Sequence, residues 1–320
     1  MLLAGDVGGT NTRLALVEER GGAFEVVVAE TAPSGEADGL WPLVESFLAR
    51  HPKRVDAAGF GLPGPVTGRR VKTTNIPWVV DHDALEERLG APVALVNDLV
   101  AAAHGALAAR PEQLAILQEG APARGARAVA AAGTGLGEAI IFRRGDELVP
   151  SASEGGHASF APQDDEEVEL WRFARQRFGH VSYERLVSGP GLAVVYDFYR
   201  ARLGHAGPLP WAHGEDPAAA VSRAAATKAD PAAEAALARF CSIYGAEAGN
   251  LALKALAVEG VYLAGGIAPK ILAELRRGGF LDAFLAKGRY RGLLARVPVW
   301  VVLDDHLGLR GAARAASRLA

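Results

Sequence analysis

The stretch Leu2-Leu3-Ala4-Gly5-Asp6-Val7-Gly8-Gly9-Thr10-Asn11 decides the fold, together with a second stretch, Gly133-Thr134-Gly135-Leu136-Gly137. Each contains a glycine and threonine turn between extended apolar runs. Glycine has no Cβ, so the backbone can approach a ligand and turn its N–H groups toward it, and threonine adds a hydroxyl donor. Either turn alone is also typical of a plain hairpin. Because both occur, and because Asp6 directly follows Gly5, we expect the two turns to clamp a phosphate without a lysine.

The composition limits the classes of protein to which the chain can belong. At 320 residues, it is long enough for roughly two domains with substantial cores. The net charge of −3 and the lack of a long basic run argue against nucleic acid as a partner. The single cysteine, Cys241, excludes an internal disulfide and a multi-thiolate zinc site. It lies in an alanine-rich helical pattern, where we expect a buried, inert thiol.

Charged residues interrupt every long apolar run, so none reaches the ~18 residues that a membrane span requires. The first residues lack the basic region of a secretory signal and lead directly to Asp6. We therefore expect a cytoplasmic protein with no membrane partner.

Strands and helices alternate in the first third of the chain. Apolar runs predict strands and helically spaced apolar residues predict helices. The expected strands are 2–7, 13–18, 24–31, 57–61, 70–74 and 93–96, and the expected helices are 40–50, 82–89 (capped by Asp81) and 99–106. This order indicates an α/β domain with a mixed, partly parallel sheet.

Helices dominate the prediction after the second glycine turn. They are expected at 166–178, 192–202, 217–226, 232–255, after Pro269 and at 307–319, with strands only at 261–264 and 298–303. No internal repeat of the sequence is evident. The second part of the chain is therefore predicted to be a helix-rich α/β domain.

Two acidic positions follow expected strands. Asp6, beside the first glycine turn, would suit Mg²⁺, directly or through water, because this ion prefers oxygen ligands; the alternative is an aspartate that caps the turn. Asn97 and Asp98 stand where a strand ends and a helix begins, where ligands bind in open α/β sheets. The alternative is a helix N-cap pair. In the functional interpretation Asn97 positions a ligand and Asp98 is the general base.

Glu154-Gly155-Gly156-His157 offers further polar side chains. Its two glycines argue against a helical Glu-x-x-His metal site, and a glycine loop with these side chains better suits a polyhydroxylated ligand. Glu184 could add another acceptor, or be a solvated helix residue. The chain has no P-loop motif, no dinucleotide fingerprint and no nucleophile elbow.

The ordered motifs resemble those of the bacterial glucokinases of the hexokinase type, in the sugar kinase and actin-like ATPase superfamily. The resemblance covers nearly the whole chain. Its motifs are 5–11, 97–98, 132–137, 154–157, 179–182, 188–192 and 263–267.

The resemblance implies a two-domain actin-like ATPase (ribonuclease H-like) fold with mixed sheets and an interdomain cleft. The small domain would span 1–108 and be completed by 301–320, and the large domain would span 109–300. The family also implies a homodimer. Its cofactors would be ATP and Mg²⁺, the metal near Asp6. The implied ATP-binding residues are Gly5, Asp6, Gly8, Gly9, Thr10, Asn11, Gly133, Thr134, Gly135, Gly265 and Gly266, and the implied glucose-binding residues are Asn75, Asn97, Asp98, Glu154, His157 and Glu184.

The predicted activity is phosphorylation of glucose at its 6-hydroxyl, with Asp98 as the base. The segment 73–78 is partly similar to related repressor–kinase proteins, so a kinase for mannose, fructose or an N-acetylhexosamine is an alternative. A non-catalytic sugar sensor is a second alternative, and polyphosphate is an alternative donor.

Overall fold

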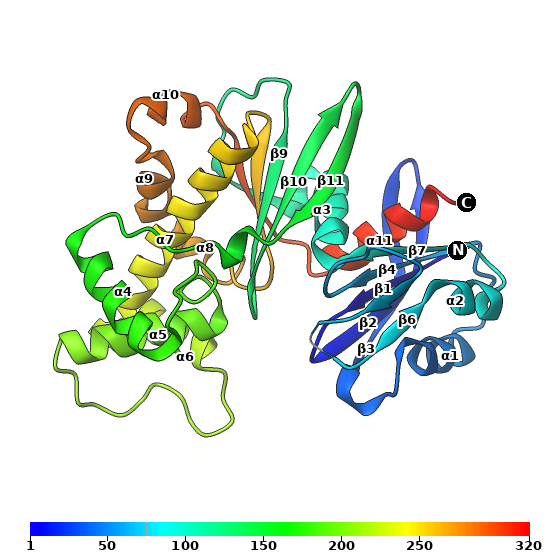
Figure 1. Cartoon of the computed structure of the whole chain (residues 1–320), viewed down its shortest axis with the longest axis horizontal. Helices are drawn as coiled ribbons and strands as arrows, with labels where there is room; N and C mark the ends of the chain where they lie inside the picture. Colours follow the sequence, from blue (N-terminus) through cyan, green and yellow to red (C-terminus); the bar gives the residue numbers. More distant parts are fainter. Residues whose placement is uncertain (75) are drawn as a thin grey trace. The chain divides into compact units, whose positions relative to one another are not determined.

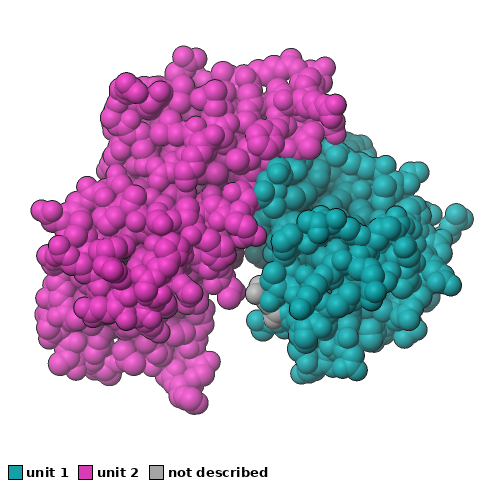
Figure 2. Space-filling view, in the orientation of Figure 1, with its two compact units in different colours: residues 1–113, 150–152, 304–320 teal, residues 114–149, 153–303 magenta. Residues whose placement is uncertain are grey.

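The computed structural model describes residues 1–74 and 76–320. The chain forms two compact units (Figure 2), and each has its own main sheet. Unit 1 comprises residues 1–113, 150–152 and 304–320, and unit 2 comprises residues 114–149 and 153–303. The sequence places the domain limits after residues 108 and 300, whereas the units change after residues 113 and 303.

Unit 1 is built on a five-stranded mixed sheet. Its strands are β1 (Leu2–Val7), β2 (Asn11–Arg20), β3 (Ala23–Pro33), β4 (Ala57–Leu62) and β7 (Val93–Asn97). They lie in the order β3-β2-β1-β4-β7. The first three strands form an antiparallel meander, and β4 and β7 continue the sheet in parallel to β1.

Four helices and a small second sheet complete unit 1 (Figure 1). The helices are α1 (Leu40–Arg50), α2 (His82–Leu89), α3 (Asp98–Ala108) and α11 (Leu307–Ser317), and the small sheet pairs β5 (Arg70–Lys72) with β6 (Val79–Asp81). The expected cap of α2 is confirmed, because Asp81 Oδ1 accepts the backbone N–H groups of Asp83 and Ala84.

The side chains of β1 enter two different cores. Leu3 packs in the core that α1 covers, whereas Leu2 and Ala4 pack in the core that α11 covers. Side chains alternate between the two faces along a strand, so Asp6 falls on the α11 face. The apolar pattern of β1 thus determines the helix that the carboxylate of Asp6 meets.

Unit 2 contains a six-stranded mixed sheet. Its strands are β8 (Leu114–Gln118), β9 (Arg127–Ala132), β10 (Leu136–Arg144), β11 (Glu147–Ser153), β12 (Gly260–Ala264) and β13 (Val299–Val302). Residues 150–152 of β11 are grouped with unit 1. Their order is β11-β10-β9-β12-β13-β8. Here too an antiparallel hairpin, β9–β10, is followed by two parallel neighbours, β12 and β13.

The helices of unit 2 form one large core with this sheet. They are α4 (Asp165–Phe178), α5 (Gly189–Arg202), α6 (Pro217–Ala226), α7 (Pro231–Ala255), α8 (Leu272–Leu275), α9 (Gly279–Leu285) and α10 (Arg291–Leu294). Helix α7 packs on the sheet, where the Tyr244 hydroxyl donates to the Ala130 carbonyl at 2.7 Å. The expected burial of Cys241 is confirmed, and burial raises the pKa of its thiol.

The structure corrects the prediction in three places. Strands β8 and β11 were not expected, whereas β10 is the extended run that follows the second glycine turn. Strand β11 is missed because its residues alternate between exposed and half-buried, with no buried apolar face. The helix expected after Pro269 is only the short α8. Of the helices in the described residues, none has both the length and the apolar character to cross a membrane.

Candidate active site

The first glycine turn, residues 8–11, is held from behind by Ser34. The Ser34 hydroxyl donates to the Gly8 carbonyl at 2.7 Å, and its backbone N–H donates to the Thr10 carbonyl at 2.9 Å. Thr12 Oγ1 lies 2.9 Å from Ser34 Oγ. Ser34 thus holds the buried side of the turn, and residues Gly9–Asn11 are exposed.

Asp6 lies beside the start of α11. A Cβ built on Gly308 would lie 2.7 Å from Asp6 Oδ2, so only glycine leaves room there for the carboxylate. Burial raises the pKa of Asp6, and the positive charge of Arg13, its cross-strand neighbour, partly opposes this effect. Because burial disfavours its anion, a cation bound here would stabilise the charged carboxylate.

Asn97 and Asp98 begin α3. Asn97 Oδ1 accepts the N–H groups of Leu99 and Val100 at 2.9 and 3.3 Å, and Asn97 Nδ2 donates to the Gly64 carbonyl at 3.1 Å. Asn97 is therefore the helix N-cap, the structural alternative considered from the sequence. Asp98 Oδ1 also accepts the Leu99 N–H, at 2.9 Å.

Unit 1 brings Asp98 close to the strand that carries Asp6. Gly61 on β4 is the parallel partner of Asp6 on β1. A Cβ on Gly61 would lie 3.6 Å from the Asp98 Cα and 3.8 Å from the Gly5 carbonyl oxygen. Two acidic residues that lie far apart in sequence thus stand at the carboxyl ends of β1 and β7 in one sheet, with β4 between them.

The segment that precedes α2 is ordered by the Thr73 hydroxyl and by the backbone N–H of Thr74. Thr73 Oγ1 donates to the Ile76 carbonyl at 2.6 Å, and the Thr74 N–H donates to the Pro63 carbonyl at 3.1 Å. Asn75, predicted to bind the sugar, lies outside the described residues.

The second glycine turn, Gly133–Gly135, closes on itself and is tied to α5. The Gly133 N–H donates to the Gly135 carbonyl, and the Gly189 N–H donates to the Gly133 carbonyl, both at 2.8 Å. Ser188 caps α5 through the Gly191 N–H and donates its hydroxyl to the Glu184 carbonyl at 2.7 Å. The 188–191 motif therefore anchors the turn.

Glu154, His157 and Glu184 converge in unit 2. His157 Nε2 lies 3.7 Å from Glu154 Oε2, and His157 Nδ1 lies 3.7 Å from Glu184 Oε1. Glu184 Oε2 accepts the Leu136 N–H at 3.0 Å, directly after the second glycine turn. Residues 155–157 form a single 3-10 turn, so Glu154 and His157 do not share an α-helix.

Gly265 and Gly266 lie next to the end of β9. Gly265 has a φ of +80°, and a Cβ there would lie 2.3 Å from the Ala132 carbonyl oxygen. Position 265 therefore requires glycine both for its backbone conformation and for the close approach. This places Gly265 beside the second glycine turn, whereas a Cβ on Gly266 would meet open space.

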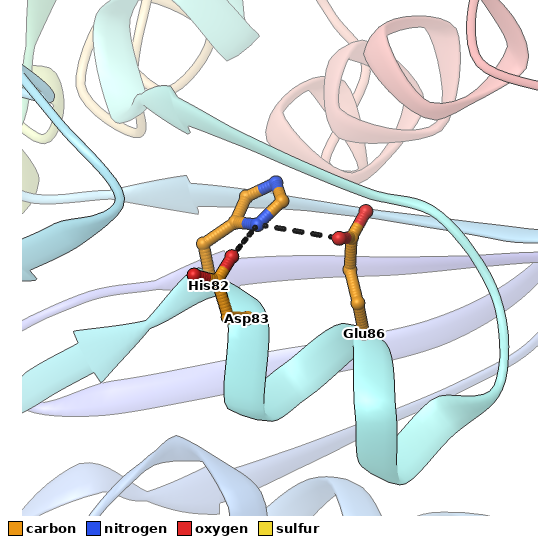
Figure 3. Close-up of side chains that lie close together, drawn as sticks. All are labelled: His82, Asp83 and Glu86. Carbon is orange, nitrogen blue, oxygen red and sulfur yellow. Dashed lines mark hydrogen bonds and ion pairs between the residues drawn. The ribbon is translucent and has the colours of Figure 1, made fainter.

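One group of metal-ligand side chains occurs in the described residues apart from these positions: His82, Asp83 and Glu86 on α2 (Figure 3). His82 Nδ1 lies 3.2 Å from Asp83 Oδ1 and 3.6 Å from Glu86 Oε2, while its Nε2 donates to the Val93 carbonyl. Arg69 pairs with both carboxylates. The Arg69 guanidinium compensates one of the two negative charges, so we interpret the group as an ion-pair network.

Sequence reasoning missed several residues that build these sites. Ser34 and Gly308 act through contacts across long sequence separations, and no local pattern marks them. Glu138, a buried acid of β10, could have been found, because it is the one charged residue between Leu136 and Ile141.

The paired mixed sheets, the two glycine turns and the converging acids and histidine define a sugar kinase with the actin-like ATPase fold. The model of the family Glucokinase matches residues 3–319. The chain belongs to the glucokinase family, and the resemblance and fold class predicted from the sequence are confirmed.

The similarity to individual proteins extends over the full length. The chain is 40% identical over 340 residues to the glucokinase of Nostoc sp. strain PCC 7120. The alignment covers 100% of this chain and 99% of that protein. The structure of glucokinase from an Antarctic psychrotroph is 30% identical, with a TM-score of 0.86 and coverage of 99% and 98%. A ROK-family glucokinase from Streptomyces griseus, solved in complex with glucose and AMPPNP, shares the fold with a TM-score of 0.70 at 23% identity, covering 99% of each chain.

Proposed function

We propose that this protein transfers the terminal phosphoryl group of ATP to the 6-hydroxyl of glucose. One observation carries the proposal: the Glu184 carboxylate lies between the second glycine turn and His157, one of the proposed sugar-binding residues. One of its oxygens accepts the Leu136 N–H at 3.0 Å, and the other lies 3.7 Å from His157 Nδ1. The proposed phosphate side and sugar side are thus tied together within unit 2. Membership of the glucokinase family supports the same activity.

Asp98 is the proposed catalytic base. Its Oδ1 accepts the Leu99 N–H at the start of α3, which orients the carboxylate. The positive end of the helix dipole favours the anionic form that a base requires. Removal of the hydroxyl proton by such a group typically contributes ~10²–10⁴ in rate.

The glycine turns are proposed to hold the phosphates. Phosphoryl transfer passes through a loose transition state, so the protein mainly positions groups and stabilises charge. Backbone N–H groups of 8–10 and 134–135 would contact phosphate oxygens, and Gly265 and Gly266 would lie at the adenosine. Asp6 would hold Mg²⁺ through the water molecules that this ion keeps. Its buried carboxylate supplies the oxygen donor that the ion prefers, and the ion would neutralise phosphate charge.

The sugar is proposed to bind through directed hydrogen bonds. Glu154, His157 and Glu184 offer acceptors and donors in unit 2. Asn97 has its Oδ1 engaged by the helix, so its remaining Nδ2 hydrogen is the group available to a sugar hydroxyl. The roles of Asn75 and Asp98 toward the sugar stay predictions.

The proposal includes a cytoplasmic homodimer, which the family resemblance supports. Light scattering coupled to size-exclusion chromatography measures the oligomeric state. A monomer at working concentration would contradict the homodimer without affecting the proposed reaction.

A coupled assay tests the activity. Glucose, mannose, fructose and N-acetylglucosamine are each supplied with Mg-ATP, with ATP alone, and with polyphosphate. We expect glucose with Mg-ATP to give the highest kcat/KM. A higher value for another hexose would assign the protein to that sugar, and sugar binding without turnover would indicate a regulator.

A further inference from the structure

Two buried carboxyl groups lie next to each other, and one of them contacts the loop Glu154–His157. They belong to Glu138 on β10 and Glu247 on α7, and each residue is 1% exposed. Neither belongs to the proposed sugar-binding set. Burying two acids side by side is costly unless one of them is neutral, so the arrangement calls for a physical explanation.

Glu247 is the member of the pair with charge-compensating partners. Its Oε2 accepts from Asn250 Nδ2 at 2.9 Å, and its Oε1 accepts from Lys254 Nζ at 3.3 Å. An ammonium and an amide donor stabilise an ionised carboxylate. Glu247 therefore has partners that can compensate a negative charge.

Glu138 has the opposite surroundings. Its Oε1 has no hydrogen-bond partner among the described residues. Its Oε2 lies against the loop, since a Cβ on Gly155 would be 2.0 Å from it. Burial first, and then the charge of Glu247, raise the pKa of Glu138 to about 8, although Lys254 opposes the shift. At neutral pH, Glu138 therefore carries the proton of the pair.

The same network reaches Glu184. Asn250 Nδ2 also donates to the Tyr183 hydroxyl at 2.9 Å, and Tyr183 directly precedes Glu184. Lys287 Nζ donates to Asn250 Oδ1 at 2.7 Å. The titratable and charged groups around the pair are Tyr244 and Lys254 on α7, Tyr183 and Glu184 before α5, Lys287 after α9, and Glu154 and His157 on the loop.

We infer that Glu138 and Glu247 position the loop Glu154–His157 for sugar binding by sharing a single proton. While Glu138 is neutral, its carboxyl can pack against the Gly155 backbone. When the proton is lost, two anions face each other and Glu138 has no counterion of its own. Hydrating that charge requires the loop to move away from β10. Glu138 is a positioning residue, and this inference rests on the proposed sugar-binding role of the loop.

The first test measures KM for glucose and kcat from pH 6.5 to 9.5. The variants are Glu138→Gln, which keeps the shape of the neutral acid, and Glu274→Gln, a control on α8 outside the network. We expect KM of the wild type and of the control to rise ~10-fold with pH while kcat changes less. Glu138→Gln should keep the low KM throughout. A flat wild-type KM, or an equal rise in Glu138→Gln, would overturn the inference.

The second test requires no turnover. Infrared difference spectra between the wild type and Glu138→Gln should show a protonated carboxyl band at pH 7 that disappears at pH 9.5. Amide hydrogen exchange at 154–157 should speed up over the same range only in the wild type, after correction for intrinsic exchange. If both results appear but glucose is not phosphorylated, the proposed function fails and the proton-sharing pair stands. If glucose is phosphorylated and the band is absent at pH 7, the inference fails.

Discussion

The two glycine turns occupy the same place in two sheets of similar topology, yet they carry different chemistry. In unit 1 the hairpin β1–β2 precedes the parallel neighbours β4 and β7, and in unit 2 the hairpin β9–β10 precedes β12 and β13. The last strand pair before the turn is Val7–Thr12 in unit 1 and Ala132–Leu136 in unit 2.

One step further from the turn, the two hairpins diverge. Unit 1 has the pair Asp6–Arg13, whereas unit 2 has Ala131–Gly137. Unit 1 therefore contributes charge beside its turn, and unit 2 contributes only backbone there. The site acids of unit 2 lie elsewhere: Glu138 directly follows Gly137 on β10, and Glu154 and Glu184 lie outside the hairpin.

The turns are also held by different means. Ser34 engages two carbonyl groups of the first turn, while the N–H of Gly189 and the carboxylate of Glu184 hold the second. The first turn is fixed by its own meander and the second by the start of a helix. We infer that unit 1 is specialised for metal and base chemistry and unit 2 for binding.

The largest expected effect comes from Asp98 in unit 1. Asp98→Asn should keep the fold but lower kcat by ~10²–10⁴, because the amide cannot accept the hydroxyl proton. Steady-state kinetics measure the loss. Asp81→Asn is the matched control, since it changes a residue at the start of α2 and leaves a capping side chain. Near-normal turnover in Asp98→Asn would remove Asp98 from its role.

Asp6→Ala places alanine in the first hairpin at the position that Ala131 occupies in the second. We expect the Mg²⁺ concentration for half-maximal activity to rise ~10–100-fold, the usual cost of losing a group that orients a bound metal. A magnesium titration of the coupled assay measures it. An unchanged requirement would mean that the difference between the hairpins has no part in metal binding.

The buried acid of unit 2 predicts a pH-dependent stability. Folding raises the pKa of Glu138 from 4.5 to about 8, so the folded protein keeps a proton that the unfolded chain releases between these values. This contribution to stability is complete below pH ~4.5 and is lost as pH rises to ~8. Relative to Glu138→Gln, the wild-type free energy of unfolding should fall by ~1.4 kcal/mol per pH unit across that range. Denaturant titrations at several pH values measure this difference, and a pH-independent difference would contradict it.

The smallest expected effect comes from the space around one glycine in each turn. A Cβ on Gly8 would lie 2.9 Å from the Asn11 carbonyl oxygen, whereas a Cβ on Gly133 meets nothing within 4 Å. Gly8→Ala should therefore cost ~1–3 kcal/mol of stability. Gly133→Ala should stay within ~0.5 kcal/mol and raise KM for ATP by crowding the phosphates. Equal losses of stability would show that the turns are packed alike.

Local patterns predicted much of the secondary structure. The bounds of β1, α1, α2 and α6 follow directly from their apolar spacing and from punctuating residues such as Pro217. Strand β11 gave no such signal, because it has no buried apolar face. The sequence predicted the site residues because they stand beside turns and at strand ends. Glycine, proline and capping residues mark such positions in the sequence.

The sequence by itself determined the family, the two glycine turns, and the acids at 6, 98, 154 and 184, because each of these depends on short motifs in a fixed order. Only the tertiary structure decided that Gly308 faces Asp6, that Ser34 holds the first turn, and that Glu138 lies against Gly155 beside Glu247. Such contacts join residues far apart in the chain. They arise when apolar faces pack, and packing is a property of the whole core that no local pattern contains.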